Sequence, residues 1–173
     1  TFLDEITPRT NIKHASEVLQ ALKDTINGTL QRKNNKAISN NGMDIGLFVL
    51  NNKTLELQFS GANSYMWIVR ENDLIELKGD NISIGGYNTD KTYSDYEIDL
   101  REDDCLYLFT DGFMDQFGGE NGQKFKKKQF KNLLMELSDM PMEKQLKAID
   151  DTFKKWKGDY DQTDDVLVVG IKV

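Results

Sequence analysis

The sequence predicts an α+β protein, in which a group of antiparallel strands is combined with separate amphipathic helices. Apolar residues at helical spacing indicate helices near the start of the chain and in its last third. The strands between them follow one another without intervening helices, which argues against a parallel α/β sheet. Short apolar runs separated by polar turns predict the consecutive strands, which form an antiparallel meander at residues 44–50, 55–59, 65–70 and 74–77.

The first part of the chain is predicted to be helical. Residues 1–12 begin with helical spacing that ends at Pro8. A second helix is expected from Ser16, whose hydroxyl can cap it, to about Arg32. The polar tract 31–41 is expected to form a loop before the strands begin.

The apolar segment 104–111 predicts a further strand, preceded by a short segment at 82–86 and a strand at 93–100. This segment is rich in aromatic residues, which is typical of a strand covered on both faces. It ends at Asp111, followed by Gly112, whose backbone permits a sharp turn. A carboxylate at the mouth of a hydrophobic sheet is costly unless a cation or a donor meets it. Asp111 is therefore a candidate site residue.

The rest of the chain predicts helices followed by one closing strand. A single helical turn is expected at 113–117, an amphipathic helix at about 125–137 and another after Pro141. The apolar strand 166–173 follows Asp164 and Asp165 directly. No internal repeat or linker divides the chain, so residues 1–173 are expected to form a single domain.

Composition excludes several classes of function. The net charge of -7 argues against general binding to nucleic acids or anionic membranes, because both favour basic proteins. No apolar run approaches the roughly 20 residues that span a bilayer. The single cysteine, Cys105, excludes an internal disulfide and fits a reducing cytoplasm, and its place in an apolar strand predicts a core residue.

The strands that carry the acidic residues predict a cation site. If 104–111 and 166–173 are antiparallel neighbours, Asp111 lies beside Asp164 and Asp165. Three carboxylates so close together would have raised pKa values or would hold a divalent cation. Oxygen ligands favour Mg²⁺ or Mn²⁺. Such a metal can activate a water for attack on a phosphate ester. The alternative, which the residues leave equally open, is that Asp111 caps a turn and the other two are solvated. A calcium loop, a phospho-accepting receiver site and a nucleophilic triad fit the sequence less well.

Five segments in order resemble landmarks of a known family. Residues 106–119 resemble the hallmark segment of the SpoIIE-type (PP2C-like) serine phosphatases, and in particular of those found as output domains of bacterial sensor and two-component proteins. Residues 163–169 are similar to the closing metal motif of that family. The segments 41–45, 60–63 and 84–86 match its intermediate landmarks.

The resemblance implies a PP2C-like antiparallel β-sandwich flanked by helices, in α/β/β/α layers. It also implies two Mn²⁺ or Mg²⁺ ions bridging a water that attacks phosphoserine or phosphothreonine. Asp111 and Asp164 would be the catalytic, metal-ligating residues. Gly112 would shape the turn of the metal site, and Asp165 would order it as a neighbour. The implied partners are a phosphorylated regulatory protein, often an anti-sigma-factor antagonist, and an upstream sensor domain.

Two earlier motifs of the family do not occur in this sequence. They are an aspartate near the first strands and an Asp-x-x-Gly-His-Gly segment, and both supply metal ligands. Residues 2–6 resemble the helix that follows the second motif, and Asn41 replaces a common aspartate. The chain is therefore expected to be an N-terminally truncated, C-terminal portion of the domain, inactive alone and self-associating through uncovered strand edges. The alternatives are a non-catalytic pseudophosphatase that binds a phosphoprotein, and a purely structural sandwich.

Overall fold

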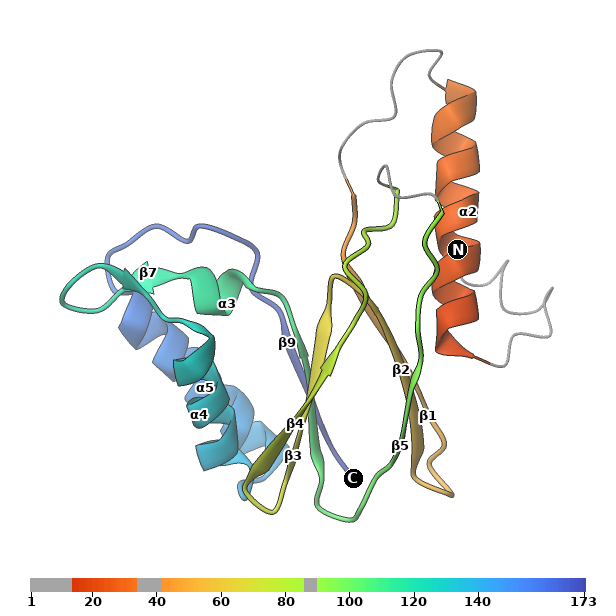
Figure 1. Ribbon diagram of the computed structural model, residues 1–173. Coiled ribbons are helices and arrows are strands. Elements are labelled where there is room, and N and C mark those ends of the chain that lie inside the picture. The colour runs from red at the N-terminus through yellow and green to blue at the C-terminus, as the bar shows by residue number, and fades with distance from the viewer. Residues whose placement is uncertain (1–13, 34–41, 86–89) are drawn as a thin grey trace. The chain divides into compact units, whose positions relative to one another are not determined.

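A computed structural model of the chain describes residues 14–33, 42–85 and 90–173 (Figure 1). These residues form helices and antiparallel sheets, which confirms the α+β class. The chain divides into two compact units: unit 1 is formed by Thr1–Tyr65 and Leu77–Leu100, and unit 2 by Met66–Glu76 and Arg101–Val173. The expected helical segment at 1–12 lies outside the described residues. So do most of the expected loop at 31–41 and the last residue, Gly86, of the segment 82–86.

Unit 1 consists of one helix and a three-stranded sheet. Helix α2 (Ala15–Lys33) lies alongside the sheet, whose strand order is β1-β2-β5 (Figure 1). The strands are β1 (Ile45–Leu50), β2 (Glu56–Ala62) and β5 (Tyr96–Asp99), and both pairings are antiparallel. Apolar residues of the helix, of β2 and of the segments before β5 form a buried cluster of Leu19, Leu22, Ala62, Ile82, Ile84 and Tyr93.

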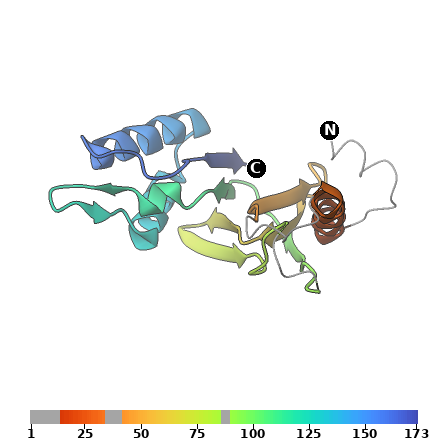
Figure 2. The ribbon, with the colours of Figure 1, turned by 90° about the horizontal axis from the view of Figure 1, so that it is seen from above.

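Unit 2 contains most of a four-stranded sheet with the order β4-β3-β6-β9. Its strands are β3 (Tyr65–Arg70), β4 (Asp73–Lys78), β6 (Cys105–Phe109) and β9 (Val168–Lys172). Between β6 and β9 the chain forms the short helix α3 (Gly112–Asp115) and a small hairpin of β7 (Phe117–Gly118) and β8 (Gln123–Lys124). The helices α4 (Lys127–Leu137) and α5 (Met142–Lys157) follow and lie next to each other (Figures 1 and 2).

An aromatic cluster joins the sheet of unit 2 to its helices. Phe130 of α4 is fully buried, and its ring centroid lies 5.7 Å from that of Trp67, 5.2 Å from that of Phe109 and 4.6 Å from that of Phe113. Cys105 is also fully buried, as expected for a core residue. The cluster fixes the end of β6 against α3, and this is the place where Asp111 lies.

Three expectations about local structure were wrong. The strands predicted as one meander belong to two sheets, because β1 pairs with β2 while β3 pairs with β6. The turn expected between the strands 55–59 and 65–70, at residues 60–63, is shorter than predicted, because residues 60–62 continue β2 and the chain turns only at Asn63, whose φ is 48°. Ser16 does not cap α2, because its backbone N–H and its hydroxyl both donate to the carboxylate of Asp95.

Alkaline pH is expected to destabilise the protein through the buried phenol of Tyr107. This hydroxyl donates to Gln145 Oε1 at 2.6 Å, and burial raises the pKa of Tyr107 well above its ordinary value. Above a pH of about 10 the unfolded chain loses this proton while the folded protein keeps it, so stability falls by about 1.4 kcal/mol per pH unit.

Tyr107→Phe tests this expectation. Between pH 9 and pH 11 we expect the urea midpoint of the wild type to fall more than that of the variant. Burial also raises the pKa of Tyr93, to about 12, but this contribution is common to both proteins and cancels. Equal shifts in both proteins would contradict the assignment to Tyr107.

Candidate functional site

The two strands that carry the predicted site residues pair as the sequence analysis expected. Strands β6 and β9 are antiparallel neighbours, with Phe109 opposite Val168. One residue further on, the backbone N–H of Thr110 donates to the carbonyl of Leu167 at 3.0 Å. The end of β6 therefore lies beside the segment that leads into β9, and the backbone brings Asp111 close to the Asp164-Asp165 pair.

Thr110 joins the two segments through its side chain, a role that sequence reasoning missed. Its hydroxyl donates to the carbonyl of Asp165 at 2.7 Å and accepts the N–H of Leu167 at 2.9 Å. The hydroxyl thus occupies the place where the regular strand pairing ends. A hydroxyl residue directly before the acidic residue at a strand end was the signal available in the sequence.

Gly112 fits this site because it has no side chain. A Cβ added at Gly112 would lie 2.4 Å from the carbonyl oxygen of Asp165, well inside van der Waals contact. The lack of a side chain therefore permits the turn after Asp111 to pack directly against the backbone of Asp165. The close approach to Asp165 is the role that the structure gives Gly112, and its place at the predicted metal site stays a prediction.

The three carboxylates differ in their local bonding. Asp111 stands at the N-cap position of α3 but makes no side-chain capping hydrogen bond there, so the structure does not use it as a helix cap. Asp164 accepts the N–H of Asp165 through Oδ1 at 2.7 Å. Asp111, Asp164 and Asp165 are all exposed. Their oxygens are thus accessible to solvent and to a cation.

The donor atoms fit a hard divalent cation in kind but not in number. Carboxylate oxygens suit Mg²⁺ and Mn²⁺, which are usually held in octahedral geometry. Within residues 14–33, 42–85 and 90–173, however, no three His, Cys, Asp or Glu side chains are grouped so that they could hold a metal ion. Asp111, Asp164 and Asp165 therefore do not form a group of three metal ligands by themselves.

Hydrogen bonds of Gln116 connect the segment after α3 to α5 and to the loop before Asp164. The buried side chain of Gln116, which follows α3, donates from Nε2 to the carbonyl of Asp161 at 2.9 Å. The backbone carbonyl of Gln116 accepts Nε1–H of Trp156 at 3.1 Å. The loop before Asp164 is therefore bonded to the segment that follows Asp111.

The intermediate landmarks of the sequence meet in unit 1. Asn63 Nδ2 donates to Asp44 Oδ1 at 3.1 Å and to Ser83 Oγ at 2.8 Å, and Ser83 Oγ donates to Asp44 Oδ1 at 3.1 Å. Three polar residues from distant parts of the chain thus share one hydrogen-bonded cluster. The cluster joins the residue before β1, the residue after β2 and Ser83, so its role is structural.

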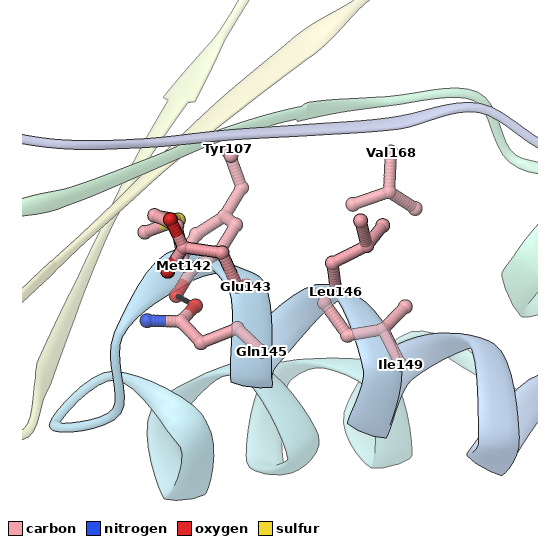
Figure 3. A pocket seen from close by; sticks show the side chains of 8 residues that line it. Tyr107, Met142, Glu143, Gln145, Leu146, Ile149 and Val168 are labelled. Carbon is pink, nitrogen blue, oxygen red and sulfur yellow. Dashed lines mark hydrogen bonds between the residues drawn. The ribbon is translucent and has the colours of Figure 1, made fainter.

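An apolar groove of about 250 Å³ lies between α5 and strands β6 and β9 (Figure 3). Leu146 and Ile149 of α5 face Val168, while Tyr107 meets Gln145 at one end (Figure 3). Leu146 is 68% exposed. The groove offers apolar contact area and one carboxylate, Glu143, and it contains none of the candidate site residues.

Gly112→Ala is expected to destabilise the protein by about 1–3 kcal/mol, because the added methyl group must push apart the two segments at the site. Gly28→Ala is a matched control, since a Cβ at Gly28 within α2 meets nothing within 4 Å. That change should leave stability unchanged or raise it by roughly 0.5–1 kcal/mol through helix propensity. Urea unfolding of both variants measures the difference, and equal midpoints would refute the close approach.

Comparison with solved structures defines the class of protein. The SiaA-PP2C domain of Pseudomonas aeruginosa matches with a TM-score of 0.87 and 26% identity, over 99% of this chain and 66% of that chain. The RsbU and RsbW domains of a Mycobacterium tuberculosis protein match with a TM-score of 0.71 and 14% identity, over 99% and 44%. The catalytic domain of the serine/threonine protein phosphatase PstP, in complex with two manganese ions, matches at 0.61 and 12%, over 97% and 75%. The fold is that of the PP2C-like phosphatase domains.

The family follows from the sequence itself. The family model of Stage II sporulation protein E (SpoIIE) matches residues 3–173, so the chain belongs to the SpoIIE family. A search of the curated proteins finds no match. The chain spans 66% of the SiaA-PP2C domain. Among the described residues, no helix is long and apolar enough to cross a membrane.

Proposed function

We propose that this chain is part of a metal-dependent protein serine/threonine phosphatase, which hydrolyses phosphoserine or phosphothreonine on a bacterial regulatory protein. The observation that carries the proposal is the pairing of β6 with β9, through which Thr110 joins the segments of Asp111 and Asp165. In a chain of the SpoIIE family, these two segments are the ones that resemble metal motifs.

Asp111 and Asp164 are the proposed catalytic, metal-ligating residues. Their carboxylates would hold Mn²⁺ or Mg²⁺, with two ions in the complete domain, as PstP holds two manganese ions. When bound, the metal lowers the pKa of a water so that it can attack phosphorus. Thr110 and Gly112 keep the two acidic segments in contact, and Asp165 orders the second of them.

The complete site is proposed to need ligands from outside the described residues. Two segments with exposed carboxylates bind a divalent cation weakly, because Mg²⁺ or Mn²⁺ requires a fuller set of oxygen ligands. Residues 1–173 would then be one domain, which is the C-terminal portion of a phosphatase domain and has low activity of its own. This view is supported by the 66% coverage of the SiaA-PP2C domain and by the incomplete carboxylate group.

The proposed setting is a cytoplasmic signalling protein with a sensor domain upstream. A phosphorylated regulatory protein, such as an anti-sigma-factor antagonist, is the proposed substrate. The pairing of the RsbU and RsbW domains in one Mycobacterium tuberculosis protein supports a regulatory partner. Strand β9 stands at the edge of its sheet, and this supports self-association of the isolated chain.

The test uses the longest natural polypeptide that contains this chain. We expect it to hydrolyse p-nitrophenyl phosphate and a phosphoserine peptide when Mn²⁺ is present, and to lose this activity in EDTA. Recovery of turnover on addition of Mn²⁺ separates metal loss from unfolding. Turnover that persists in EDTA, with no bound metal found by elemental analysis, would refute the proposal.

A second candidate function is a pseudophosphatase that binds a phosphoprotein without hydrolysing it. The observation that favours it is the lack of a three-ligand metal group among the described residues. In the same assay this protein would bind the phosphoserine peptide and release no phosphate at any Mn²⁺ concentration. Phosphate release and peptide binding, measured on one preparation, therefore distinguish the two functions.

A further inference from the structure

A pocket of about 550 Å³ lies in unit 2, between the β7–β8 hairpin and the C-terminal end of α5. Its lining is mainly apolar and aromatic. Phe125 is buried, Trp156 is half-buried and Tyr160 is 46% exposed. The rim carries two lysines, Lys155 and Lys157, and two carboxylates, Glu120 and Asp159, so it has no net charge. The mainly apolar lining therefore favours an apolar or aromatic group over a charged one.

The aromatic walls are held in place by the backbone. The ring of Trp156 meets that of Phe125 edge-on, with centroids 5.2 Å apart, and its Nε1–H donates to the carbonyl of Gln116. The N–H of Gly119 donates to the carbonyl of Trp156 at 2.8 Å, and a Cβ at Gly119 would lie 3.1 Å from the indole ring. Gly119 also has a φ of +67°, which disfavours other residues. The pocket is thus preformed.

Both walls of the pocket are close in sequence to the candidate catalytic residues, Asp111 and Asp164. One wall, the hairpin, follows α3, which begins directly after Asp111. The other wall ends at Tyr160, four residues before Asp164. Four residues span at most about 14 Å when fully extended. An extended peptide with its phosphorylated residue at the acidic segments therefore reaches the pocket within about three to five residues.

We propose that this pocket binds an apolar side chain of the phosphoprotein substrate, three to five residues from the phosphorylated serine or threonine. The inference rests on the proposed phosphatase function and adds to it a determinant of substrate choice. A second copy of the chain is the less suitable occupant, because the self-association proposed above uses the edge of β9, which does not line this pocket. Burial of one aromatic side chain between Trp156 and Tyr160 supplies the affinity.

The test compares three phosphoserine peptides on the longest natural polypeptide that contains the chain. The first has Phe four residues before the phosphoserine, the second has Phe four residues after it, and the third has Ser at both places. We expect one of the Phe peptides to show a kcat/KM at least about tenfold above that of the Ser peptide, as burial of one aromatic side chain allows. Tyr160→Ala should remove most of this preference while leaving hydrolysis of p-nitrophenyl phosphate unchanged.

Leu146→Ala is the matched control, because Leu146 is an exposed apolar residue of the same helix that lies outside the pocket. It should leave the preference intact. Equal kcat/KM values for all three peptides, or a preference that survives Tyr160→Ala, would overturn the inference while the phosphatase function stands.

Absence of turnover on both the peptides and p-nitrophenyl phosphate would refute the phosphatase function instead. The pocket is then judged by binding, measured as fluorescence anisotropy of the labelled peptides. Tighter binding of a Phe peptide that Tyr160→Ala abolishes would support the pocket, and equal binding of all three peptides would refute it.

Discussion

Asp111→Asn is expected to lower the Mn²⁺-dependent phosphatase activity of the natural polypeptide by roughly 10²–10³-fold, with little change in stability. The amide keeps the shape of the side chain but removes the charge that a divalent cation requires. Asp111 makes no capping hydrogen bond in α3, so the substitution breaks no helix cap. A loss of this size is on the order of what removal of a main electrostatic contribution to catalysis produces.

The measurement is the initial rate of p-nitrophenyl phosphate hydrolysis over a range of Mn²⁺ concentrations, together with the thermal midpoint of each protein. Asp151→Asn, at an exposed position of α5, is the matched control and should retain full activity. If excess Mn²⁺ restores the rate of Asp111→Asn completely, Asp111 contributes to metal affinity alone. Full activity at low Mn²⁺ would remove Asp111 from the site.

Sequence alone could predict the elements that carry the candidate site. An apolar strand ending in Thr-Asp-Gly and another beginning after two aspartates are local patterns, and both strands form where expected. Their pairing could be proposed as well, because antiparallel neighbours bring the end of one strand to the start of the other. Helices α4 and α5 followed from the regular spacing of their apolar residues.

Other features depend on contacts that no local pattern reveals. The strands belong to two sheets, which the sequence did not indicate. The small residues at the end of β2 have the composition of a turn but form part of the strand. The β7–β8 hairpin is short and packs on Trp156, a residue far along the chain. The bridging role of Thr110 depends on two partners more than 50 residues away. Long-range contacts of this kind override local propensity.

Arg70→Met is expected to destabilise the protein by about 3–5 kcal/mol, because it leaves the buried carboxylate of Asp104 without its cation. Asp104 is 1% exposed, and Arg70 donates to it from Nη2 at 2.6 Å and from Nε at 2.9 Å. The backbone N–H of Arg101 completes the set at 2.8 Å. The hydrogen bonds to Asp104 raise the pKa of Arg70 above its ordinary value, although burial opposes this. The guanidinium therefore stays charged at every pH at which the protein folds.

Three further variants separate the buried charge from the loss of packing. Arg70→Lys should recover only part of the lost stability, because an ammonium group cannot bind both carboxylate oxygens in the planar geometry of a guanidinium. The double variant Arg70→Met with Asp104→Leu removes both charges and should be more stable than Arg70→Met alone. Lys154→Met breaks an exposed pair with Asp150 on α5 and should leave the urea midpoint unchanged. If Arg70→Met unfolds at the same urea concentration as Lys154→Met, the buried pair contributes no more than an exposed one.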